Sequence, residues 1–160
     1  MSDSRKINTE SLKVSVMIPT YNQAHLIVRA IDSTLSQTYK NIEIIISDDC
    51  STDETSKVVS QIIRERSDHR ISYHRNHENL GILRNYHDTL LKTTGELVIN
   101  LDGDDFFVNS KFFEQAVTLF EEDSDISLLF GNYCEYNENT KEKISIYNRN
   151  LPRTMDSLFF

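Results

Sequence analysis

Three aspartates lie within four residues of one another at the end of an apolar run. The run Leu97-Val-Ile-Asn-Leu101 is followed by Asp102, Asp104 and Asp105, with Gly103 between the first two. Carboxylates this close repel one another unless water solvates them or a cation lies among them. The cluster is therefore either a solvated acidic turn or a divalent-metal site, and an Asp-x-Asp motif alone is too short to decide between them.

Polar side chains also follow two other runs that have the composition of buried strands. The run from Val14 to Pro19 is followed by Thr20-Tyr-Asn22, and the run from Ile42 to Ser47 is followed by Asp48 and Asp49. In parallel α/β sheets, ligands bind outside the carboxyl ends of the strands. Three strand ends that carry polar groups therefore predict one shared site, which favours the metal-and-ligand interpretation.

The segments between these strands have the spacing of helices. Asn22 is placed to cap the first helix, Ser51 to Glu54 have the spacing of a capping box for the second, and Gly95 is placed to end the third. Apolar residues recur three and four positions apart, as one face of a helix requires. They are Ile27, Ala30, Ile31 and Leu35, then Val58, Val59, Ile62 and Ile63, then Leu83, Tyr86 and Leu90, and finally Phe113, Ala116, Val117 and Phe120.

Alternating strands and helices predict an α/β fold with a mainly parallel sheet flanked by helices. Two shorter runs, Ile71 to His74 and Ser127 to Phe130, complete the predicted strands, and no element is predicted from Asn137 to Phe160. A chain of 160 residues suits one domain and can bury a substantial core.

Composition argues against several classes of protein. The formal charge of −8 would repel a polyanion, so no nucleic-acid partner is expected. Cys50 and Cys134 belong to no Cys-x-x-Cys pair, which argues against a structural zinc site and makes a reducing compartment the default. No uncharged run approaches the roughly 20 residues of a membrane helix, and residues 1–10 lack a signal-peptide core. We expect a cytoplasmic protein, at the inner face of a membrane if a longer parent carries an anchor.

The glycines do not form a phosphate-binding loop. They are Gly81, Gly95, Gly103 and Gly131. Neither Gly-x-Gly-x-x-Gly nor Gly-x-x-x-x-Gly-Lys can be written with them, so carboxylate-held Mg²⁺ or Mn²⁺ would have to neutralise phosphates. A calcium-binding EF-hand loop starting at Asp102 would place Phe106 and Phe107 where an oxygen ligand and a glycine are required. A calcium sensor is therefore not expected.

Four motifs, in this order, resemble the signatures of the large inverting nucleotide-sugar glycosyltransferase family with the GT-A fold. They are Val14 to Asn22, Ser47 to Thr55, Asn79-Leu-Gly81 and Gly95 to Asp105, and the resemblance covers about Lys13 to Tyr133. It implies transfer of a sugar, with inversion, from a nucleoside-diphosphate sugar to an acceptor hydroxyl. A UDP-sugar donor and a saccharide or lipid-linked acceptor would fit a role in polysaccharide or glycoconjugate synthesis.

The resemblance also implies which residues would bind the nucleotide sugar. Pro19 and Tyr21 would line the nucleobase pocket, Tyr21 by stacking, and Asp49 would accept a hydrogen bond from the base. Asp102 would contact the ribose or act through metal-bound water, and Arg84 is a candidate for a phosphate contact.

Asp104 would ligate the Mg²⁺ or Mn²⁺ that bridges the diphosphate, and Asp48, Asp53 and Asp105 would orient these groups or cap helices. A divalent cation would act as a Lewis acid on the leaving diphosphate. A carboxylate general base would deprotonate the acceptor.

The resemblance implies that this base comes from a second half of full-length relatives, beyond the fifth strand, and so lies outside this chain. No motif supports Glu135 or Asp156 in that role. We interpret residues 1–10 as a polar leader, 11–135 as the donor-binding domain and 136–160 as the start of an incomplete acceptor region. The alternative is a non-catalytic nucleotide-sugar binding or assembly module. A nucleotidyltransferase is disfavoured, because Pro19-Thr-Tyr-Asn22 is not a glycine-rich loop. The oligomeric state is open, and a homo-oligomer is compatible with the sequence.

Overall fold

The computed structural model describes residues 11–147, and the side chains of residues 11–143. The chain forms two compact units that divide between Ser110 and Lys111. Each unit is described by itself below. All the predicted nucleotide-binding and metal-binding residues belong to the first unit.

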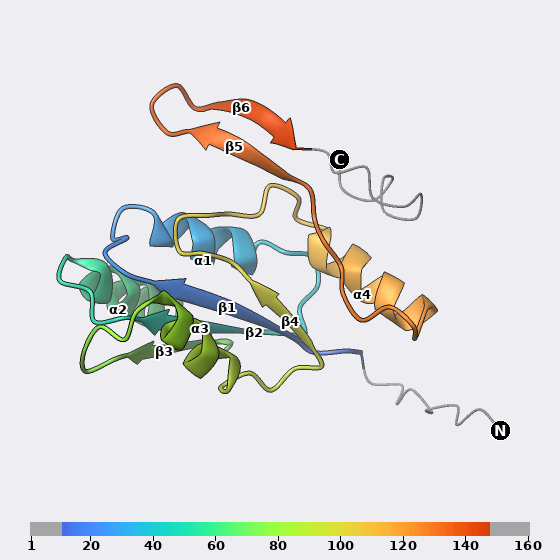
Figure 1. Cartoon of the computed structure of the whole chain (residues 1–160), viewed down its shortest axis with the longest axis horizontal. Helices are drawn as coiled ribbons and strands as arrows, with labels where there is room; N and C mark the ends of the chain where they lie inside the picture. Colours follow the sequence, from blue (N-terminus) through green and yellow to red (C-terminus); the bar gives the residue numbers. More distant parts are fainter. Residues whose placement is uncertain (1–10, 148–160) are drawn as a thin grey trace. The chain divides into compact units, whose positions relative to one another are not determined.

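A parallel sheet in the order β3-β2-β1-β4 forms the centre of the first unit (Figure 1). Its strands are β1 (Val14–Thr20), β2 (Ile42–Asp48), β3 (Ile71–Arg75) and β4 (Leu97–Asn100). Val14 is in register with both Ile42 and Leu97, so these strands run side by side in one direction. Beyond β4 the chain continues along β1, since Leu101 N–H donates to Met17 O and Gly103 N–H to Pro19 O. The predicted parallel α/β fold is confirmed, and the Asp-Gly-Asp turn lies at the end of β1.

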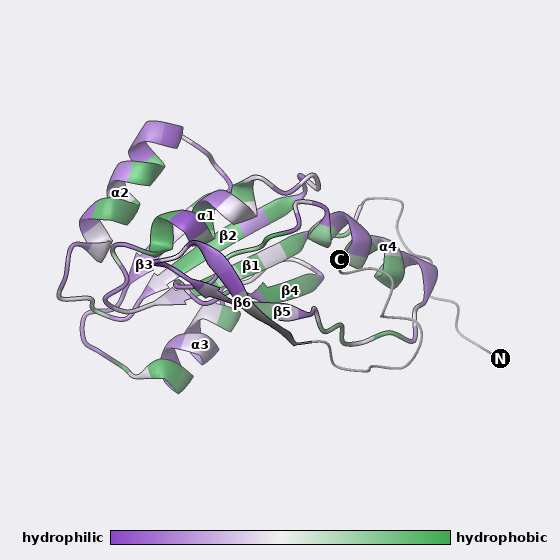
Figure 2. Cartoon of the chain, turned by 90° about the horizontal axis from the view of Figure 1, so that it is seen from above, coloured by the Kyte–Doolittle hydropathy of each residue, from purple (hydrophilic) through white to green (hydrophobic). Residues whose placement is uncertain are grey.

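Helices cover both faces of this sheet. In Figure 2, α1 (Ile27–Leu35) and α2 (Thr55–Arg66) lie on one side of the strands and α3 (Ile82–Leu90) on the other. β1 is buried along its whole length, and β2 along all but one residue, as expected of strands rich in isoleucine and valine in a covered parallel sheet. Within residues 11–147, every helix is too short or too polar to cross a bilayer.

The predicted caps of the first two helices are wrong. Leu26 precedes α1 and makes no side-chain cap bond, while Asn22 has φ 56° and binds a different loop. Ser51 to Glu54 form no capping box, because Asp53 Oδ1 accepts the N–H of Thr55 at 2.9 Å instead. Local spacing favoured these caps, but the same polar side chains are used to join two loops to each other.

The buried face of α3 also differs from the prediction. Asn85 and Thr89 are buried, whereas Leu83 is 84% and Leu90 47% exposed. Asn85 accepts a hydrogen bond from the Ser47 hydroxyl at 2.8 Å and donates one to the Ser47 carbonyl at 3.0 Å. These paired bonds satisfy buried polar groups of β2, so α3 packs a polar face against the sheet.

Gly95 does not end α3 as predicted. The helix ends in right-handed geometry at Leu91. Gly95 lies against the amino end of β1, where a Cβ would stand 2.5 Å from the Lys13 carbonyl oxygen. A glycine is needed there for close approach of two backbones.

The second unit contains α4 (Phe112–Glu122) and an antiparallel hairpin of β5 (Tyr133–Asn137) and β6 (Glu142–Tyr147). The helix confirms the prediction, with Phe113, Ala116 and Val117 buried. The predicted strand from Ser127 to Phe130 does not form, and Leu128 is 62% exposed. An apolar run needs a pairing partner to become a strand, and pairing occurs further along, around the turn that Lys141 N–H closes on Asn137 O.

A hydrogen-bonded carboxylate joins three segments at the amino end of the sheet. Glu43 on β2 accepts from Lys13 Nζ at 2.7 Å, from Ser15 Oγ at 2.5 Å and from Thr94 N–H at 2.7 Å. Burial acts to raise the pKa of Glu43, but the bonds from Lys13, Ser15 and Thr94 outweigh it and hold that pKa at about 2, below the usual 4.5. The ionised form therefore stabilises the turn that leads into β4.

We expect Glu43→Gln to lower the free energy of unfolding by about 2 kcal/mol at pH 7. Because the folded pKa is depressed, this stabilisation is present above pH 4.5 and is lost as the pH falls towards about 2. Urea unfolding at several pH values measures the difference, which should shrink as the pH falls through this range. Glu65→Gln, at an exposed position on α2, is the matched control. A constant difference between pH 7 and pH 3 would contradict the expectation.

Candidate functional site

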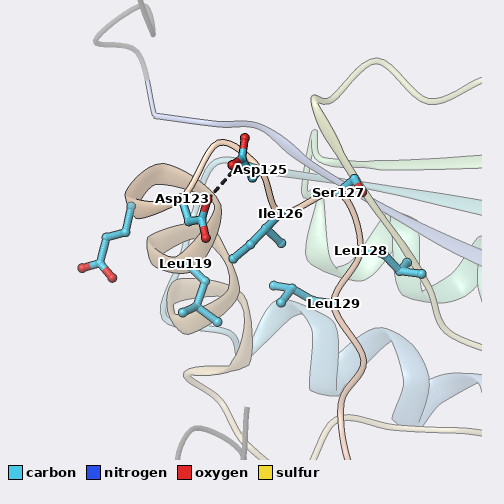
Figure 3. A pocket seen from close by; sticks show the side chains of 8 residues that line it. Leu119, Asp123, Asp125, Ile126, Ser127, Leu128 and Leu129 are labelled. Carbon is cyan, nitrogen blue, oxygen red and sulfur yellow. Dashed lines mark hydrogen bonds between the residues drawn. The ribbon is translucent and has the colours of Figure 1, made fainter. Parts of the chain in front are cut away.

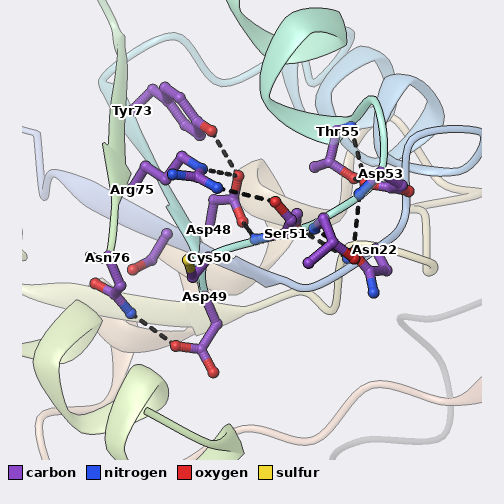
Figure 4. Close-up of polar contacts among 12 residues, drawn as sticks. Asn22, Asp48, Asp49, Cys50, Ser51, Asp53, Thr55, Tyr73, Arg75 and Asn76 are labelled. Atoms are coloured by element: carbon purple, nitrogen blue, oxygen red, sulfur yellow. Dashed lines mark hydrogen bonds and ion pairs between the residues drawn. The ribbon is translucent and has the colours of Figure 1, made fainter. Parts of the chain in front are cut away.

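Two loops at the carboxyl edge of the sheet are joined by side chains from each (Figure 4). Asn22 Oδ1 accepts the N–H of Thr52 at 2.8 Å, and Asn22 N–H donates to Ser51 Oγ at 2.9 Å. Ala24 N–H donates to Asp53 Oδ2 at 3.1 Å. The loops after β1 and β2 are therefore hydrogen-bonded to each other, which explains why Asn22 does not cap the helix that follows it. Asp53 serves both purposes, because its Oδ1 also accepts the N–H of Thr55 at the start of α2.

Asp48, at the end of β2, is a structural residue in this arrangement (Figure 4). Its carboxylate is fully buried and accepts from Ser51 N–H at 2.7 Å and Tyr73 OH at 2.6 Å, with Arg75 Nε 3.6 Å away. Burial and the bond to Asp48 raise the pKa of Tyr73, so its hydroxyl remains a donor. The supporting role predicted for Asp48 therefore has a geometric basis.

Asp49 lies on the opposite side of the same loop and binds the segment before α3. The residue is buried, with 3% of its surface exposed. Oδ1 accepts from Asn76 Nδ2 at 2.9 Å and from Leu80 N–H at 2.8 Å, and Oδ2 accepts from Gly81 N–H at 2.9 Å. Gly81 has φ +80°, a conformation that favours glycine. A carboxylate oxygen has two lone pairs, so Oδ2 retains acceptor capacity, and the proposed contact with a nucleobase stays a prediction.

Tyr21 and Pro19 are placed differently at the end of β1. Tyr21 is 45% exposed, so its ring is available for stacking. Pro19 is buried within the strand, and its carbonyl receives the N–H of Gly103 at 3.2 Å. Tyr21 therefore offers an aromatic surface, whereas Pro19 joins β1 to the Asp-Gly-Asp turn.

Asp102 is half-buried and receives two hydrogen bonds that the sequence did not predict. Tyr86 OH and Asn100 Nδ2 both donate to Oδ1, the latter at 3.0 Å. Burial and the bond to Asp102 raise the pKa of Tyr86 to about 12. Tyr86 was assigned to an apolar helix face, and Asn100 to the end of an apolar strand. One signal was available: Asn100 is two residues from Asp102, and positions two apart share a face in extended chain.

The segment after the aspartates lies along α1. A Cβ on Gly103 would contact Thr20 Oγ1 at 2.8 Å, so only glycine fits without movement. Further along, Phe107 N–H donates to Ser33 Oγ at 3.1 Å, and the Arg29 guanidinium lies 4.0 Å from the centre of the Phe106 ring. These contacts fix the turn from both ends.

The carboxylates of the turn fit a divalent cation shared with a ligand's phosphates. The Asp104 side chain is exposed and makes no hydrogen bond or ion pair within residues 11–143. Burial, and then the charges of Asp104 and Asp102, raise the pKa of Asp105, which indicates mutual repulsion. No cluster of three metal-ligating side chains is preformed in the described part of the chain. Mg²⁺ and Mn²⁺ are commonly held by one or two carboxylates together with substrate phosphates, so the exposed Asp104 suits such a site.

Arg84 lies in the first turn of α3 and is largely exposed. Its Nε is 3.7 Å from Asp88 Oδ2, and its side chain is 70% exposed. An exposed ion pair at this spacing holds an arginine only weakly. Arg84 is therefore free to reorient, and its contact with phosphate stays a prediction.

The second unit has a pocket of its own, about 410 Å³ in volume (Figure 3). Leu119, Ile126 and Leu129 are among its apolar lining residues, and Asp123 accepts the N–H of Asp125 at its rim. None of the predicted site residues lines this pocket.

Comparisons with known proteins agree with this fold and these motifs. The sequence model of Glycosyl transferase family 2 matches residues 15–159. The Escherichia coli protein WfaP, named UDP-Glc:alpha-D-GlcNAc-diphosphoundecaprenol beta-1,3-glucosyltransferase, is 37% identical over 120 residues, covering 75% of this chain and 45% of WfaP. Across the curated relatives compared, the chain spans from 16% to 48% of their length.

Solved structures share the architecture. S. aureus TarS in complex with UDP-GlcNAc has a TM-score of 0.63 and 28% identity, covering 69% of this chain and 32% of TarS. The mannosyltransferase PcManGT from Pyrobaculum calidifontis, solved with GDP-Man and Mn²⁺, has a TM-score of 0.65 and 25% identity, covering 81% of this chain and 37% of PcManGT. Together with the parallel sheet and the ordered motifs, these matches show that the chain belongs to Glycosyl transferase family 2 and has the GT-A glycosyltransferase fold.

Proposed function

We propose that this chain is the donor-binding part of a metal-dependent glycosyltransferase that uses a UDP-sugar and inverts the anomeric centre. The observation that carries the proposal is the Asp-Gly-Asp turn bonded to the end of β1 through Gly103 N–H and Pro19 O, while the exposed Tyr21 follows Pro19 by two residues. Carboxylates suited to a cation and an aromatic side chain suited to a base therefore lie at the same end of β1. The complexes of TarS with UDP-GlcNAc and of PcManGT with GDP-Man and Mn²⁺ support it.

In this proposal the residues contact different parts of the nucleotide sugar. Tyr21 stacks on the base, Asp49 accepts a hydrogen bond from it, Asp102 accepts one from the ribose, and Arg84 reaches the phosphates. Asp104 holds Mg²⁺ or Mn²⁺, which supplies positive charge to the leaving diphosphate when bound. The acceptor is a saccharide or a lipid-linked sugar, the base that deprotonates it lies outside this chain, and the protein works in the cytoplasm.

Calorimetric titration of the chain with UDP, with and without Mn²⁺, tests this function. We expect Mn²⁺ to strengthen UDP binding by at least about tenfold, because each tenfold step needs only about 1.4 kcal/mol of added attraction. GDP and ADP in parallel titrations report selection of the base. UDP affinity that is the same in EDTA and in Mn²⁺ would refute the metal dependence, and absence of UDP binding in both would refute the donor site.

A nucleotide-sugar binding or assembly module without transfer activity is the second candidate. The chain spans 45% of WfaP. In our scheme the acceptor-activating base lies outside this chain, so the chain alone would bind a donor without transferring its sugar. Metal-dependent release of sugar from a panel of UDP-sugars by this chain would favour the transferase. Tight UDP binding with no release over days would favour the module.

A further inference from the structure

Donors from two different elements converge on one oxygen of Asp102. Tyr86, on α3, donates its hydroxyl to Oδ1, and Asn100, the last residue of β4, donates Nδ2 to the same oxygen at 3.0 Å. Asn100 Nδ2 is also 3.3 Å from the Tyr86 hydroxyl oxygen. The three side chains therefore form a closed polar triangle, which we call the Asp102 triangle.

Only one of the two Asp102 carboxylate oxygens, Oδ1, accepts hydrogen bonds in the triangle. Oδ2 of Asp102 has no hydrogen-bond partner among the described residues. The terminal torsion of an aspartate is broad, so an unsupported carboxylate adopts a wide range of orientations. Two donors on Oδ1 narrow this range and thereby fix the position of the other oxygen, Oδ2.

The backbone beneath Asp102 is also held. Leu101 N–H donates to Met17 O at 2.9 Å, and Asp105 N–H donates to Asp102 O at 2.9 Å. The carboxylate therefore cannot move away with its main chain, and its direction is set by Tyr86 and Asn100. A group fixed in this way can select a ligand by the position of a single hydroxyl.

We propose that Tyr86 and Asn100 are positioning residues that aim Oδ2 of Asp102 at a ribose hydroxyl, and that they thereby set the preference of the site for ribonucleotides over deoxyribonucleotides. This proposal rests on the proposed function, since it assumes that Asp102 faces the ribose. A fixed acceptor distinguishes a sugar that carries the hydroxyl from one that lacks it. A freely rotating carboxylate pairs less well with the ribose hydroxyl, and its orientation makes no difference to a sugar that lacks this hydroxyl.

The test compares UDP with 2′-deoxy-UDP and 3′-deoxy-UDP by calorimetry in Mn²⁺. The unaltered chain should bind UDP about tenfold more tightly than at least one deoxy analogue, as loss of one hydrogen bond to a charged group predicts. Tyr86→Phe should reduce that ratio to about twofold or less, by weakening UDP binding and leaving the deoxy analogue nearly unchanged. Asn100→Ala should shift the ratio in the same direction.

Tyr39→Phe is the matched control, because Tyr39 OH donates to the Leu12 carbonyl and makes no hydrogen bond to the triangle within the described residues. It removes a hydroxyl of the same kind, and the UDP-to-deoxy-UDP ratio should not change. Thermal unfolding of each variant separates a loss of fold from a loss of selection. If Tyr86→Phe does not fold, the Asn100→Ala ratio decides the question.

The outcomes separate the two proposals. If the unaltered chain binds UDP but treats both deoxy analogues alike, or if the folded variants keep the full ratio, the positioning role is overturned while the donor site stands. If the unaltered chain does not bind UDP at all, the proposed function fails and this inference falls with it. A ratio that collapses in both variants and is kept in Tyr39→Phe supports the inference.

Discussion

Replacing Asp104 by asparagine is expected to weaken Mn²⁺-dependent UDP binding by at least about tenfold, in line with the effect of disturbing the groups around a metal. The Asp104 carboxylate is exposed and has no protein partner within residues 11–143, so its charge is available to a cation. In EDTA the same variant should bind UDP as well as, or slightly better than, the unaltered chain. Removing a carboxylate near the diphosphate reduces repulsion when no metal is present. The substitution should therefore weaken UDP binding in Mn²⁺ and leave it unchanged or slightly stronger in EDTA.

Asp125→Asn makes the same change in net charge in the second unit, where Asp125 is exposed. It should leave both titrations unchanged, which separates a local metal ligand from a general effect of charge. Calorimetry with UDP in Mn²⁺ and in EDTA measures all four combinations. If Asp104→Asn weakens UDP binding equally in Mn²⁺ and in EDTA, Asp104 contacts the nucleotide directly and holds no metal.

Replacing Asp48 by alanine is expected to lower the free energy of unfolding by about 3 kcal/mol, because two donors lose their acceptor. Ser51 N–H and Tyr73 OH both donate to this carboxylate, whose side chain is fully buried. Leaving a buried donor unpaired costs about 1–3 kcal/mol. Urea unfolding, with circular dichroism as the signal, measures the change.

Tyr73→Phe is the control for this loss. It removes one hydrogen bond of Asp48 and leaves the bond to Ser51, so it should cost about 1 kcal/mol. If Asp48→Ala costs no more than Tyr73→Phe, the loop after β2 does not depend on this carboxylate. In Asp48→Ala, UDP binding should weaken as well, because the loop after β2 that carries Asp49 is less ordered without this carboxylate.

The strands could be predicted from the sequence because they depend on runs of neighbouring residues. The hydrogen bonds between residues far apart in the chain could not. The strands ending at Thr20, Asp48 and Asn100 were visible because isoleucine and valine recur in unbroken runs and polar residues follow them. Their meeting at one edge follows from parallel topology alone. The Asp-Gly-Asp turn could therefore be placed at the site before its neighbours were known.

The partners of these residues could not be predicted, because the pairing residues are far apart in the chain. Asn22 binds the N–H of Thr52, thirty positions away, and a local capping rule assigns it to the helix that follows it instead. Tyr86 has the spacing of an apolar face, yet its hydroxyl points to Asp102. The strand predicted from Ser127 failed for a related reason, since pairing is decided by which segments lie side by side.

Helix α3 is hydrogen-bonded to both carboxylates that the proposed scheme assigns to the base and the ribose, Asp49 and Asp102. Gly81, at its start, donates its N–H to Asp49, and Tyr86, within it, donates its hydroxyl to Asp102. A short helix moves as a rigid body, so a tilt of α3 is felt at both carboxylates at once. In the proposed scheme α3 therefore positions both the carboxylate that binds the base and the carboxylate that binds the ribose. Binding of the base at Asp49 is then energetically linked to the orientation of Asp102.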